Sequence, residues 1–388
     1  MTTTIDNEHK TFNVPNLRFP EFEGEWEEHG LSEFLDFKNG LNPKPEKFGK
    51  GIKFISVMDI LNNTIITYDS IKACVDANNK EIDNYSVKMG DLLFQRSSET
   101  LEDVGRANVY MDEKPAIFGG FVIRGKKKGE YNPLFFKNLL ETPFSRRKII
   151  PMGAGAQHFN IGQEGLSKVK LYFAPINEQN KIAKILFLLD DRISTQNKII
   201  EKLETLIKGI AQHWIKNITS RSIYVKLGDI CQITTGKLDA NAQVDNGIYP
   251  FFTCAEQPFK IDSFAFHTEA LLISGNGANL GYINYYNGKF NAYQRTYVLD
   301  VFSENIQYIK WVLKVLLPKR IAIEKSSSNT PYILLSTLSD LMLPIPSKEN
   351  QYHIAELMQS LERKLSSQIT LNGSYNILKQ YLLRQMFI

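Results

Sequence analysis

The sequence has few residues of the kinds that build covalent or metal-held frameworks. Only three cysteines occur in 388 residues, Cys74, Cys231 and Cys254, and no two of them form a C-x-x-C pair. The six histidines are scattered, without the spacing of metal ligands. This scarcity argues against a disulfide framework or a zinc ribbon, predicts no metal site in the chain, and fits a reducing cytoplasm.

Long apolar runs and a leader peptide are also missing. No apolar run approaches the roughly 18 residues of a membrane span, so no membrane association is expected. The start, "MTTTIDNEHK", has no basic segment followed by an apolar one, so we expect no signal peptide. The length of 388 residues predicts two or three domains, and a composition of 43% hydrophobic and 23% charged residues predicts that they are globular. A net charge of +4 permits a polyanionic partner without demanding one.

Signatures of catalysis are weak. "NPLF" at residues 132–135 resembles the Asn-Pro-Pro-Phe motif of amino-methyltransferases, but leucine replaces the second proline. The alternative is a helix start, with Asn132 as the cap and Pro133 at the first helical position. "GNGANLG" is not a G-x-G-x-x-G turn, and nothing matches a P-loop. The sequence therefore predicts no catalytic residue and no cofactor in this chain.

One stretch of the chain occurs twice. "LDDRISTQNKIIEKLETL" begins at Leu189 and "LERKLSSQITLNGSYNIL" at Leu361, and the two align without a gap when shifted by 172 positions. Upstream of each quoted segment the chain has a proline, then a capping-type residue (Asn177 or Ser347) and an acidic residue. Together these residues are typical of a helix start. We therefore predict two long helices that belong to one internal repeat.

Apolar residues recur along both copies at heptad-like spacing. One interpretation is that each helix packs on its own domain. Because each copy is the other's best match, we favour pairing of the two, with the glutamines fixing the register. The second copy puts Asn372 and Lys379 in the seam, so its apolar stripe is expected to drift toward Leu371 and Leu378. The predicted seam comprises Leu189, Ile193, Gln196, Leu203, Ile210, Leu361, Leu365, Gln368 and Leu382.

Shorter segments also repeat ahead of each helix. "LSEFLDFKNG" resembles "LGDICQITTG", "DLLFQRS" resembles "ALLISGN", "GRANVY" resembles "GYINYY", and "GGFVI" resembles "RTYVL". The offsets change, which indicates loops of different length between shared strands. The plan is therefore a globular unit and a long helix, twice, with mixed α/β units. We predict strands at residues 53–57, 92–95, 116–123, 271–274 and 297–301, and helices at 133–140 and 304–317.

The chain resembles the DNA-specificity subunit of type I restriction–modification systems. The resemblance rests on "PNLRFPEFEGEWEEHGLSEFLDFKNG", "GDLLFQRSS" and "APINEQNKIAKILFLLDDRISTQNKIIEKLETLIKGI", and it extends over nearly the whole length. One motif departs from the family: the glycine-rich loop usual after "GDLL" reads "SSETLEDVG" here. Base-reading roles are therefore not carried onto that loop.

The resemblance implies an architecture and a set of partners. Two α/β target recognition domains would be separated by an antiparallel coiled coil of two helices, with pseudo-twofold symmetry. Each domain would read one half of a split target on double-stranded DNA, and the helices would set the gap. Two methyltransferase subunits that use S-adenosylmethionine and restriction/translocase subunits that use ATP and Mg²⁺ are the implied partners. The expected segments are an arm (1–22), two recognition domains (23–170 and 222–342) and two spacers (171–221 and 343–388).

Basic clusters and polar loops are the candidate DNA contacts. Lysines and arginines suit phosphate contacts, and Arg, Asn, Gln, Ser and Thr suit base edges. The alternative interpretation is an ordinary solvated surface for the clusters and ordinary turn chemistry for the loops. Further lysines and arginines cluster in "RGKKKG" and "SRRK". The predicted contacts are Lys44, Lys47, Lys50, Gln95, Arg96, Ser97, Ser98, Arg106, Gln157, His158, Asn276, Asn279, Gln294, Arg295, Thr296, Lys325, Asn329 and Thr330.

The function expected from this pattern is that of a non-catalytic specificity subunit in the cytoplasm. Two other classes stay open at this point: a stand-alone DNA methyltransferase or nuclease with a built-in reader, and a coiled-coil scaffold that binds no nucleic acid. Binding of S-adenosylmethionine by the purified chain would favour the first of these. Absence of any salt-dependent DNA affinity, even with partner subunits, would favour the second.

Overall fold

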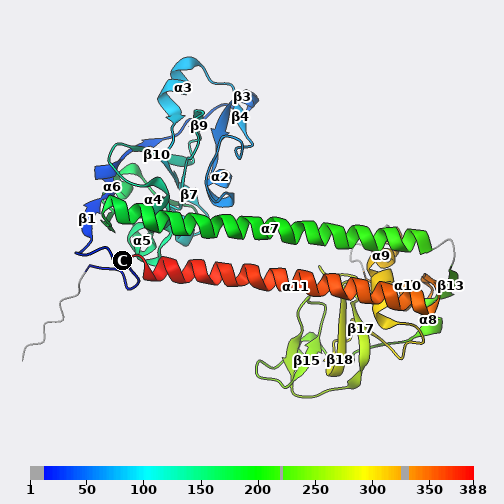
Figure 1. Cartoon of the computed structure of the whole chain (residues 1–388). Coiled ribbons are helices and arrows are strands. Elements are labelled where there is room, and N and C mark those ends of the chain that lie inside the picture. The colour runs from blue at the N-terminus through cyan, green and yellow to red at the C-terminus, as the bar shows by residue number, and fades with distance from the viewer. Residues whose placement is uncertain (1–12, 219–221, 325–331) are drawn as a thin grey trace, which may run out of the picture. The chain divides into compact units, whose positions relative to one another are not determined.

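The chain divides into two compact units. The computed structural model describes residues 13–218, 222–324 and 332–388. The first unit comprises Met1–Gln196 with Leu371–Ile388, and the second comprises Asn197–Thr370. Two long helices, α7 (Ile176–Ile218) and α11 (Lys348–Gln385), each contribute to both units, and Figure 1 shows each as continuous.

The first unit is built around an antiparallel four-stranded sheet with the order β2-β10-β6-β8. Its central strand β6 is buried along its whole length, as the unbroken apolar run "LLF" predicts. Helices α4 and α5 contribute to the apolar core of this unit. The strands are β2 (Leu35–Asn39), β10 (Val122–Lys127), β6 (Leu92–Gln95) and β8 (Ala107–Val109), and the helices are α4 (Pro133–Glu141) and α5 (Pro143–Ile149).

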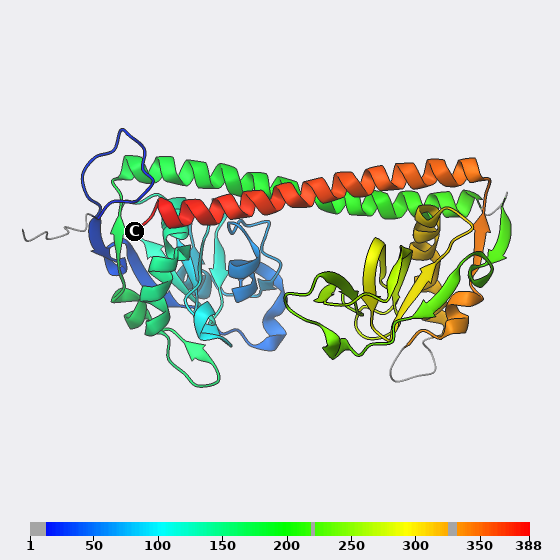
Figure 2. The same cartoon turned by 90° about the horizontal axis from the view of Figure 1, so that it is seen from below.

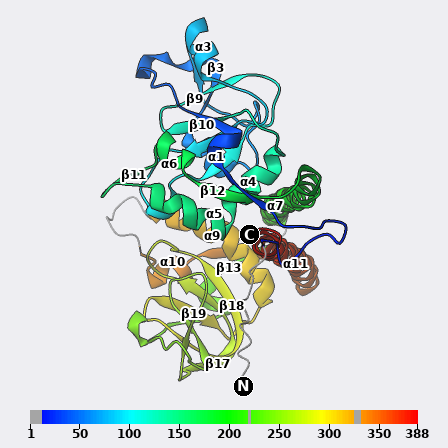
Figure 3. The same ribbon diagram turned by 90° about the vertical axis from the view of Figure 1, so that its left-hand side faces the viewer.

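A second sheet, with the order β4-β3-β9-β5, forms a separate lobe of this unit. Figures 1 and 3 show this lobe with helix α3 on the side of the first unit that faces away from α7. Helix α2 follows β3 directly. The elements are β3 (Phe48–Ile55), β4 (Cys74–Val75), β5 (Ser86–Val87), β9 (Ala116–Phe118), α2 (Val57–Asn62) and α3 (Asn79–Tyr85).

Two predicted strands of the first unit need correction. Residues 116–123 are not one strand, because Gly119 and Gly120 turn the chain from β9 in one sheet into β10 in the other. A Cβ atom at Gly119 would lie 2.8 Å from the Phe54 ring, so this turn requires glycine. The strand at 53–57 ends at Ile55, because the Asp59 carboxylate accepts from the Ser56 backbone N–H (2.7 Å) and starts α2.

Short elements complete the first unit. Strand β1 pairs with β12 next to the start of α7, and β7 pairs with β11 at the loops that follow β6. These elements are β1 (Glu27–Gly30), β12 (Lys170–Phe173), β7 (Ser97–Ser98), β11 (Phe159–Asn160), α1 (Leu31–Phe34) and α6 (Gln163–Ser167).

The second unit has one six-stranded sheet with the order β14-β19-β17-β18-β15-β16. Helix α9 contributes to its core and α10 lies beside α9. The strands are β14 (Gln232–Thr235), β19 (Thr296–Asp300), β17 (Phe266–Ser274), β18 (Ile283–Ala292), β15 (Tyr249–Phe252), β16 (Phe259–Ile261), β13 (Ile223–Lys226) and β20 (Met342–Ile345). The helices are α8 (Leu227–Ile230), α9 (Ile306–Glu324) and α10 (Leu335–Ser339).

The two units repeat one topology. The order β2-β10-β6-β8 in the first unit matches β14-β19-β17-β18 in the second, and the pair β1-β12 matches β13-β20. Short helices that begin at Leu31 and Leu227 follow the first strand of each unit. The prediction of two mixed α/β units with two long helices and an internal repeat is therefore confirmed.

A shared glutamine holds the start of each long helix. The Gln179 amide accepts from the Asn132 backbone N–H (2.9 Å) and donates to the Ala174 carbonyl (2.8 Å). Gln351 accepts from the Asn305 N–H (3.0 Å) and donates to a backbone carbonyl five residues before it. Both asparagines cap the next helix, so the predicted Asn132 cap with Pro133 behind it is confirmed. One hydrogen-bonded frame thus occurs twice.

The predicted caps of the long helices differ in outcome. The Ser347 hydroxyl accepts from the Asn350 N–H (3.4 Å) at the start of α11, as expected. Asn177 lies inside α7 and does not cap it, because the helix already begins at Ile176. The backbone N–H groups of Glu178 and Gln179 donate instead to the carbonyl of Pro175 (2.9 and 3.0 Å).

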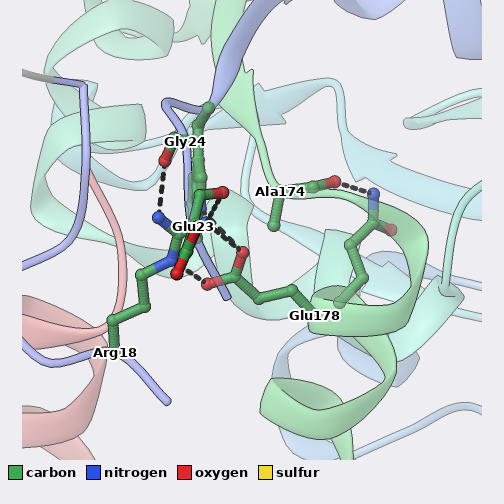
Figure 4. Close-up of polar contacts among 7 residues, drawn as sticks. Arg18, Glu23, Gly24, Ala174 and Glu178 are labelled. Atoms are coloured by element: carbon green, nitrogen blue, oxygen red, sulfur yellow. Dashed lines mark hydrogen bonds and ion pairs between the residues drawn. The ribbon is translucent and has the colours of Figure 1, made fainter. Parts of the chain in front are cut away.

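The N-terminal segment, from residue 13 onward, is fastened to the first unit by a buried ion pair. The Arg18 guanidinium donates two parallel hydrogen bonds of 2.8 Å to the Glu178 carboxylate, and Figure 4 shows this pair next to the Gly24 carbonyl. The Glu178 side chain is fully buried, and Trp26 Nε1 also donates to it (3.3 Å). The Phe387 ring, close to the chain end, stacks on Phe135 at a centroid distance of 5.2 Å.

Within each unit, α7 and α11 pack together in antiparallel directions. In the first unit Leu383, in the last turn of α11, and Met386, which directly follows the helix, share a core with Ile182 and Leu186 of α7, and Figure 2 shows the two ribbons side by side there. In the second unit the first turns of α11 share a core with the last turns of α7. The residues that pack there include Ile207, Ala211, Ile215, Ile354, Ala355 and Met358.

The drift expected for the second stripe is wrong. Leu371 and Leu378 are 38% and 45% exposed, so the stripe does not turn toward them. Lys379 stays in the seam instead, where its ammonium lies 2.7 Å from the carboxylate of Asp190, and Asn372 is half-buried. An ion pair between the helices satisfies the charge, so the chain has no need to rotate the helix.

Candidate nucleic-acid interface

Loops at one end of β6 gather several predicted contacts of the first unit. Strand β7 pairs with β11, which sets Ser97 opposite Asn160, and the Ser97 hydroxyl donates to the Asn160 side chain. The Ile161 N–H donates to the Arg96 carbonyl (3.0 Å). The loop that carries Gln157 and His158, both exposed, is thereby held next to "QRSS". The structure thus brings together two predicted loops that lie about sixty residues apart.

The side chains of "QRSS" differ in their exposure. Gln95 is 5% exposed and its amide donates to the Ser97 carbonyl (2.9 Å), which leaves it no surface for a direct base contact in this conformation. Arg96 is half-buried and donates to the Gly120 carbonyl (3.2 Å). Ser98 accepts from the Thr100 N–H (3.2 Å). Arg96, Ser97 and Ser98 keep partly exposed side chains at the surface.

The lysines predicted to contact phosphates lie on the β3 lobe. Lys44 is exposed, whereas Lys47 approaches the Glu81 carboxylate to 3.4 Å and Lys50 approaches Asp76 to 3.7 Å. Exposed ion pairs of this kind are weak, so the lysines remain able to exchange partners. Contact with phosphate stays a prediction for all three lysines.

Parts of the basic clusters "RGKKKG" and "SRRK" are structural. Arg124 is 8% exposed and donates to the Ser86 carbonyl, so it belongs to the interior. Arg146 donates to the carbonyls of Glu102 (2.8 Å) and Val104 (2.6 Å), and burial, with a smaller effect of nearby Arg106, lowers its pKa to about 10. Buried guanidinium groups that satisfy backbone carbonyls are scaffold elements, which the charge pattern alone did not reveal.

The backbone of Arg106 lies beside Gln95, whose N–H donates to the Arg106 carbonyl (2.7 Å). The Arg106 guanidinium lies 2.7 Å from the Asp103 carboxylate and is half exposed. The Arg106 side chain lines a pocket of about 380 Å³ together with Arg146 and with Gln380 of α11. The structure thus gives the Arg106 side chain surroundings different from those of the loops after β6.

The second unit brings its predicted loops together around a cysteine. The Cys254 thiol donates to the Asn276 side-chain oxygen (3.0 Å), and the Asn279 amide donates to the Cys254 carbonyl (3.0 Å). The Arg295 carbonyl accepts from the Gly275 N–H (2.8 Å). Sequence reasoning missed Cys254, because a lone cysteine in a polar loop carries no spacing signal.

The turn between β18 and β19 exposes two of the remaining predicted contacts. Gln294 and Arg295 are both exposed, at the tip of this turn. Thr296 is 1% exposed, so burial withdraws its hydroxyl from any base edge in this conformation. Lys325, Asn329 and Thr330 lie outside the described residues, although their flank is placed by a bridge between Asn276 and Tyr332.

The predicted seam residues lie on the side of α7 and α11 that the protein covers. Leu189 and Gln196 are 8% and 5% exposed. Leu361 and Leu365 pack against the core of the second unit, and Leu382 packs against that of the first. The residues Ile193, Leu203, Ile210 and Gln368 are each partly buried.

The described residues contain neither a cluster of metal-ligating side chains nor a helix suited to a membrane. Among them, no group of three or more His, Cys, Asp or Glu side chains is arranged to hold a metal ion. Within the same ranges, no helix combines the length and apolar character needed to cross a membrane.

Comparison with known proteins places the chain in a family. The model of the type I restriction modification DNA specificity domain matches residues 23–205 and 222–372. The specificity subunit of the type I restriction enzyme EcoDI from Escherichia coli is 42% identical over 143 residues, which are 37% of this chain and 32% of that protein. The specificity subunit of the enzyme MpnII from Mycoplasma pneumoniae is 28% identical over 155 residues, 38% of this chain and 45% of that protein. The alignments thus span less than half of each of these two relatives.

A solved structure has the same fold along the whole chain. The crystal structure of a type I restriction–modification S subunit from M. genitalium superposes with a TM-score of 0.68 and 18% identity, covering 97% of this chain and 99% of that one. The family model matches both repeats and most of the residues, including the loops described above. The chain therefore belongs to the type I restriction–modification DNA specificity domain family.

Proposed function

We propose that this chain is the DNA sequence-recognition subunit of a type I restriction–modification complex. Each globular unit reads one half of a bipartite target on double-stranded DNA, and the chain itself catalyses nothing. The observation that carries this proposal is the repeated frame: two units of one topology, each held at a long helix by the same glutamine, present different polar loops at equivalent places. A reader of two unlike half-sites needs such an arrangement.

The chemistry belongs to partners in this proposal. Two methyltransferase subunits supply S-adenosylmethionine, and restriction/translocase subunits supply ATP and Mg²⁺, in the cytoplasm. A solved structure with the same fold, at a TM-score of 0.54 and 16% identity, comes from work on complex assembly of the type I R-M system. Exposed apolar residues along α7 and α11, such as Leu188 (54%) and Ile377 (73%), are available for such subunits.

Methylome mapping tests the proposal. Cells that express the chain with its methyltransferase are expected to methylate one bipartite motif. Replacing residues 222–342 with the same segment of a relative is expected to change one half of that motif and leave the other. Absence of methylation with retained S-adenosylmethionine binding by the chain alone would favour a stand-alone enzyme, and absence of any salt-dependent DNA affinity would favour a scaffold.

The long helices are proposed to set the gap between the half-sites. Four residues inserted after Lys202 in α7 and four after Ser367 in α11 lengthen both helices by roughly 6 Å. The half-sites are expected to keep their bases, and the gap between them to grow by one or two base pairs at about 3.4 Å each. Activity on the original spacing alone would show that the helices do not set the gap.

A further inference from the structure

The turn between β9 and β10 in the first unit occupies the same structural position as the turn between β18 and β19 in the second. The Arg96 N–H donates to the Phe121 carbonyl (2.9 Å), and the Gly275 N–H donates to the Arg295 carbonyl (2.8 Å). Both turns close with an N–H three residues after the acceptor carbonyl, from Val122 to Gly119 (2.9 Å) and from Thr296 to Tyr293 (2.8 Å). Phe121 is therefore the counterpart of Arg295.

The Phe121 turn is held firmly, and yet the ring is exposed. Arg96 donates to the carbonyl of Gly120, and a Cβ atom at Gly120 would lie 1.8 Å from the Asn42 side-chain oxygen, so the turn packs directly against the loop that contains Asn42. The Phe121 side chain is nevertheless 68% exposed. An aromatic ring kept in water on a fixed backbone loses hydrophobic stabilisation unless something covers it.

An apolar groove opens beside this ring. Its volume is about 480 Å³, and its walls include Phe48 and Met58, which are 45% and 60% exposed. Ser97, a predicted contact, also lines it. Lys44 is exposed two residues beyond Asn42 of the same wall, so positive charge flanks the groove where a phosphate backbone would run.

Base edges differ in what an apolar groove can accept. In the major groove of DNA, thymine alone presents a methyl group, and apolar side chains such as phenylalanine contact it. Guanine, adenine and cytosine edges at this place would leave their donors and acceptors without partners. In the second unit the equivalent turn presents Gln294 and Arg295, side chains that suit adenine and guanine.

We propose that Phe121 and the groove beside it receive the 5-methyl edge of a thymine in the half-site read by the first unit. This inference rests on the proposed function, since it identifies one base within that target. Phe121 is then a specificity-determining residue, and the two units read chemically different bases from one shared turn.

The test uses the full chain with its methyltransferase subunits and the motif found by methylome mapping. The half-site of the first unit is the half that survives replacement of residues 222–342. In duplexes that carry the motif, each thymine of that half is replaced in turn by deoxyuridine, which lacks only the methyl group, and affinity is measured by fluorescence anisotropy. One replacement is expected to weaken binding about fourfold, the effect of one buried methyl group.

Variants connect that methyl group to Phe121. In Phe121→Ala the same replacement is expected to change affinity by less than about 1.5-fold, because the contact is already lost. Phe121→Leu keeps an apolar contact and is expected to retain discrimination. Met89→Ala, which truncates a side chain 55% exposed before the opposite end of β6, is expected to behave as the parent chain does.

Two results would overturn the inference without touching the proposed function. One is a half-site with no thymine on either strand, and the other is a deoxyuridine effect that is equally large in the parent chain and in Phe121→Ala. Failure of the proposed function gives a distinct result, because methylome mapping would then find no bipartite motif and the deoxyuridine series could not be designed.

Discussion

The two units share a buried frame and differ in almost everything that surrounds it. Gln179 with Asn132 and Gln351 with Asn305 make the same hydrogen bonds at the starts of α7 and α11. The first unit adds a separate sheet, β4-β3-β9-β5, where the second adds only β15 and β16 to its main sheet. Buried polar groups need their partners and hence keep their identity, whereas exposed insertions are free to diverge. The comparison teaches that repetition is retained where hydrogen bonds are buried.

Ion pairs also occur next to the long helices in both units, but they join different partners. In the first unit Lys137 pairs with Glu141 (2.8 Å), and Lys379 pairs with Asp190. In the second unit Lys310 and Lys314 both pair with Glu362 (2.6 and 3.1 Å). At the position equivalent to Lys379 the second unit has Ile207, which is 6% exposed. The two seams thus satisfy the same packing with different chemistry.

The largest effect is expected from the buried ion pair between Arg18 and Glu178 of the first unit. Arg18→Ala leaves the fully buried Glu178 carboxylate without its cation, so the free energy of unfolding of the first unit should fall by about 3–5 kcal/mol. Denaturant titration with hydrogen exchange resolved by unit measures this change. Asn350 is the exposed counterpart of Glu178, and Asn350→Ala should leave both units unchanged.

A double variant separates the lost charge from the lost packing at this site. Arg18→Met combined with Glu178→Met removes both charges and should recover most of the stability that Arg18→Ala loses. Equal destabilisation by the double variant would mean that the pair contributes shape rather than charge compensation.

Replacing Gln179 and Gln351 tests whether the two equivalent glutamines stabilise their units equally. Gln179→Ala and Gln351→Ala each remove a buried amide and leave a backbone donor and a backbone acceptor without this partner, so each should lower the free energy of unfolding of its own unit by about 2–3 kcal/mol. Gln212→Ala, at an exposed position on α7, is the matched control and should change stability by less than about 0.5 kcal/mol. A large effect from only one frame glutamine would show that the shared geometry carries unequal weight.

The smallest loss of stability is expected from a substitution that makes the helix contacts of the first unit resemble those of the second. Lys379→Ile copies Ile207 into the first unit and strands the Asp190 carboxylate, whose side chain is 10% exposed, at a cost of about 1–2 kcal/mol. Adding Asp190→Leu should restore the midpoint of thermal unfolding. A loss that persists in the double variant would mean that the isoleucine does not fit the seam.

The sequence alone predicts the repeated strands and helices, but it aligns one pair of repeated strands incorrectly. The alignments of "LSEFLDFKNG" with "LGDICQITTG" and of "GRANVY" with "GYINYY" agree with the strand pairs, because apolar alternation and glycines mark both. The alignment of "GGFVI" with "RTYVL" is wrong by two residues, since Val122 and Thr296 are equivalent partners of the glycines at positions 40 and 236. Two short valine-containing runs allow either register, and only the hydrogen bonds decide.

The surface was harder to predict than the core. Gln95, Arg124, Arg146 and Thr296 have the polar or charged character of DNA contacts, and the fold uses them as buried or partly buried partners of its own backbone, or buries them outright. Phe121 was overlooked because an aromatic residue after two glycines is typical of a strand start. Whether a side chain faces inward depends on the sheet to which its strand belongs, and that pairing is non-local.

The completion of the first unit by residues 371–388 has a consequence for how the protein is made. Leu383, Met386 and Phe387 are buried in the core formed by the early part of the chain. A ribosome that adds roughly 5–20 residues per second needs on the order of 10–40 s to travel from residue 196 to those positions. During that interval the apolar side chains that Leu383, Met386 and Phe387 cover in the finished first unit stay exposed on the nascent chain, and the second unit, which ends at Thr370, is synthesised before the first unit is complete.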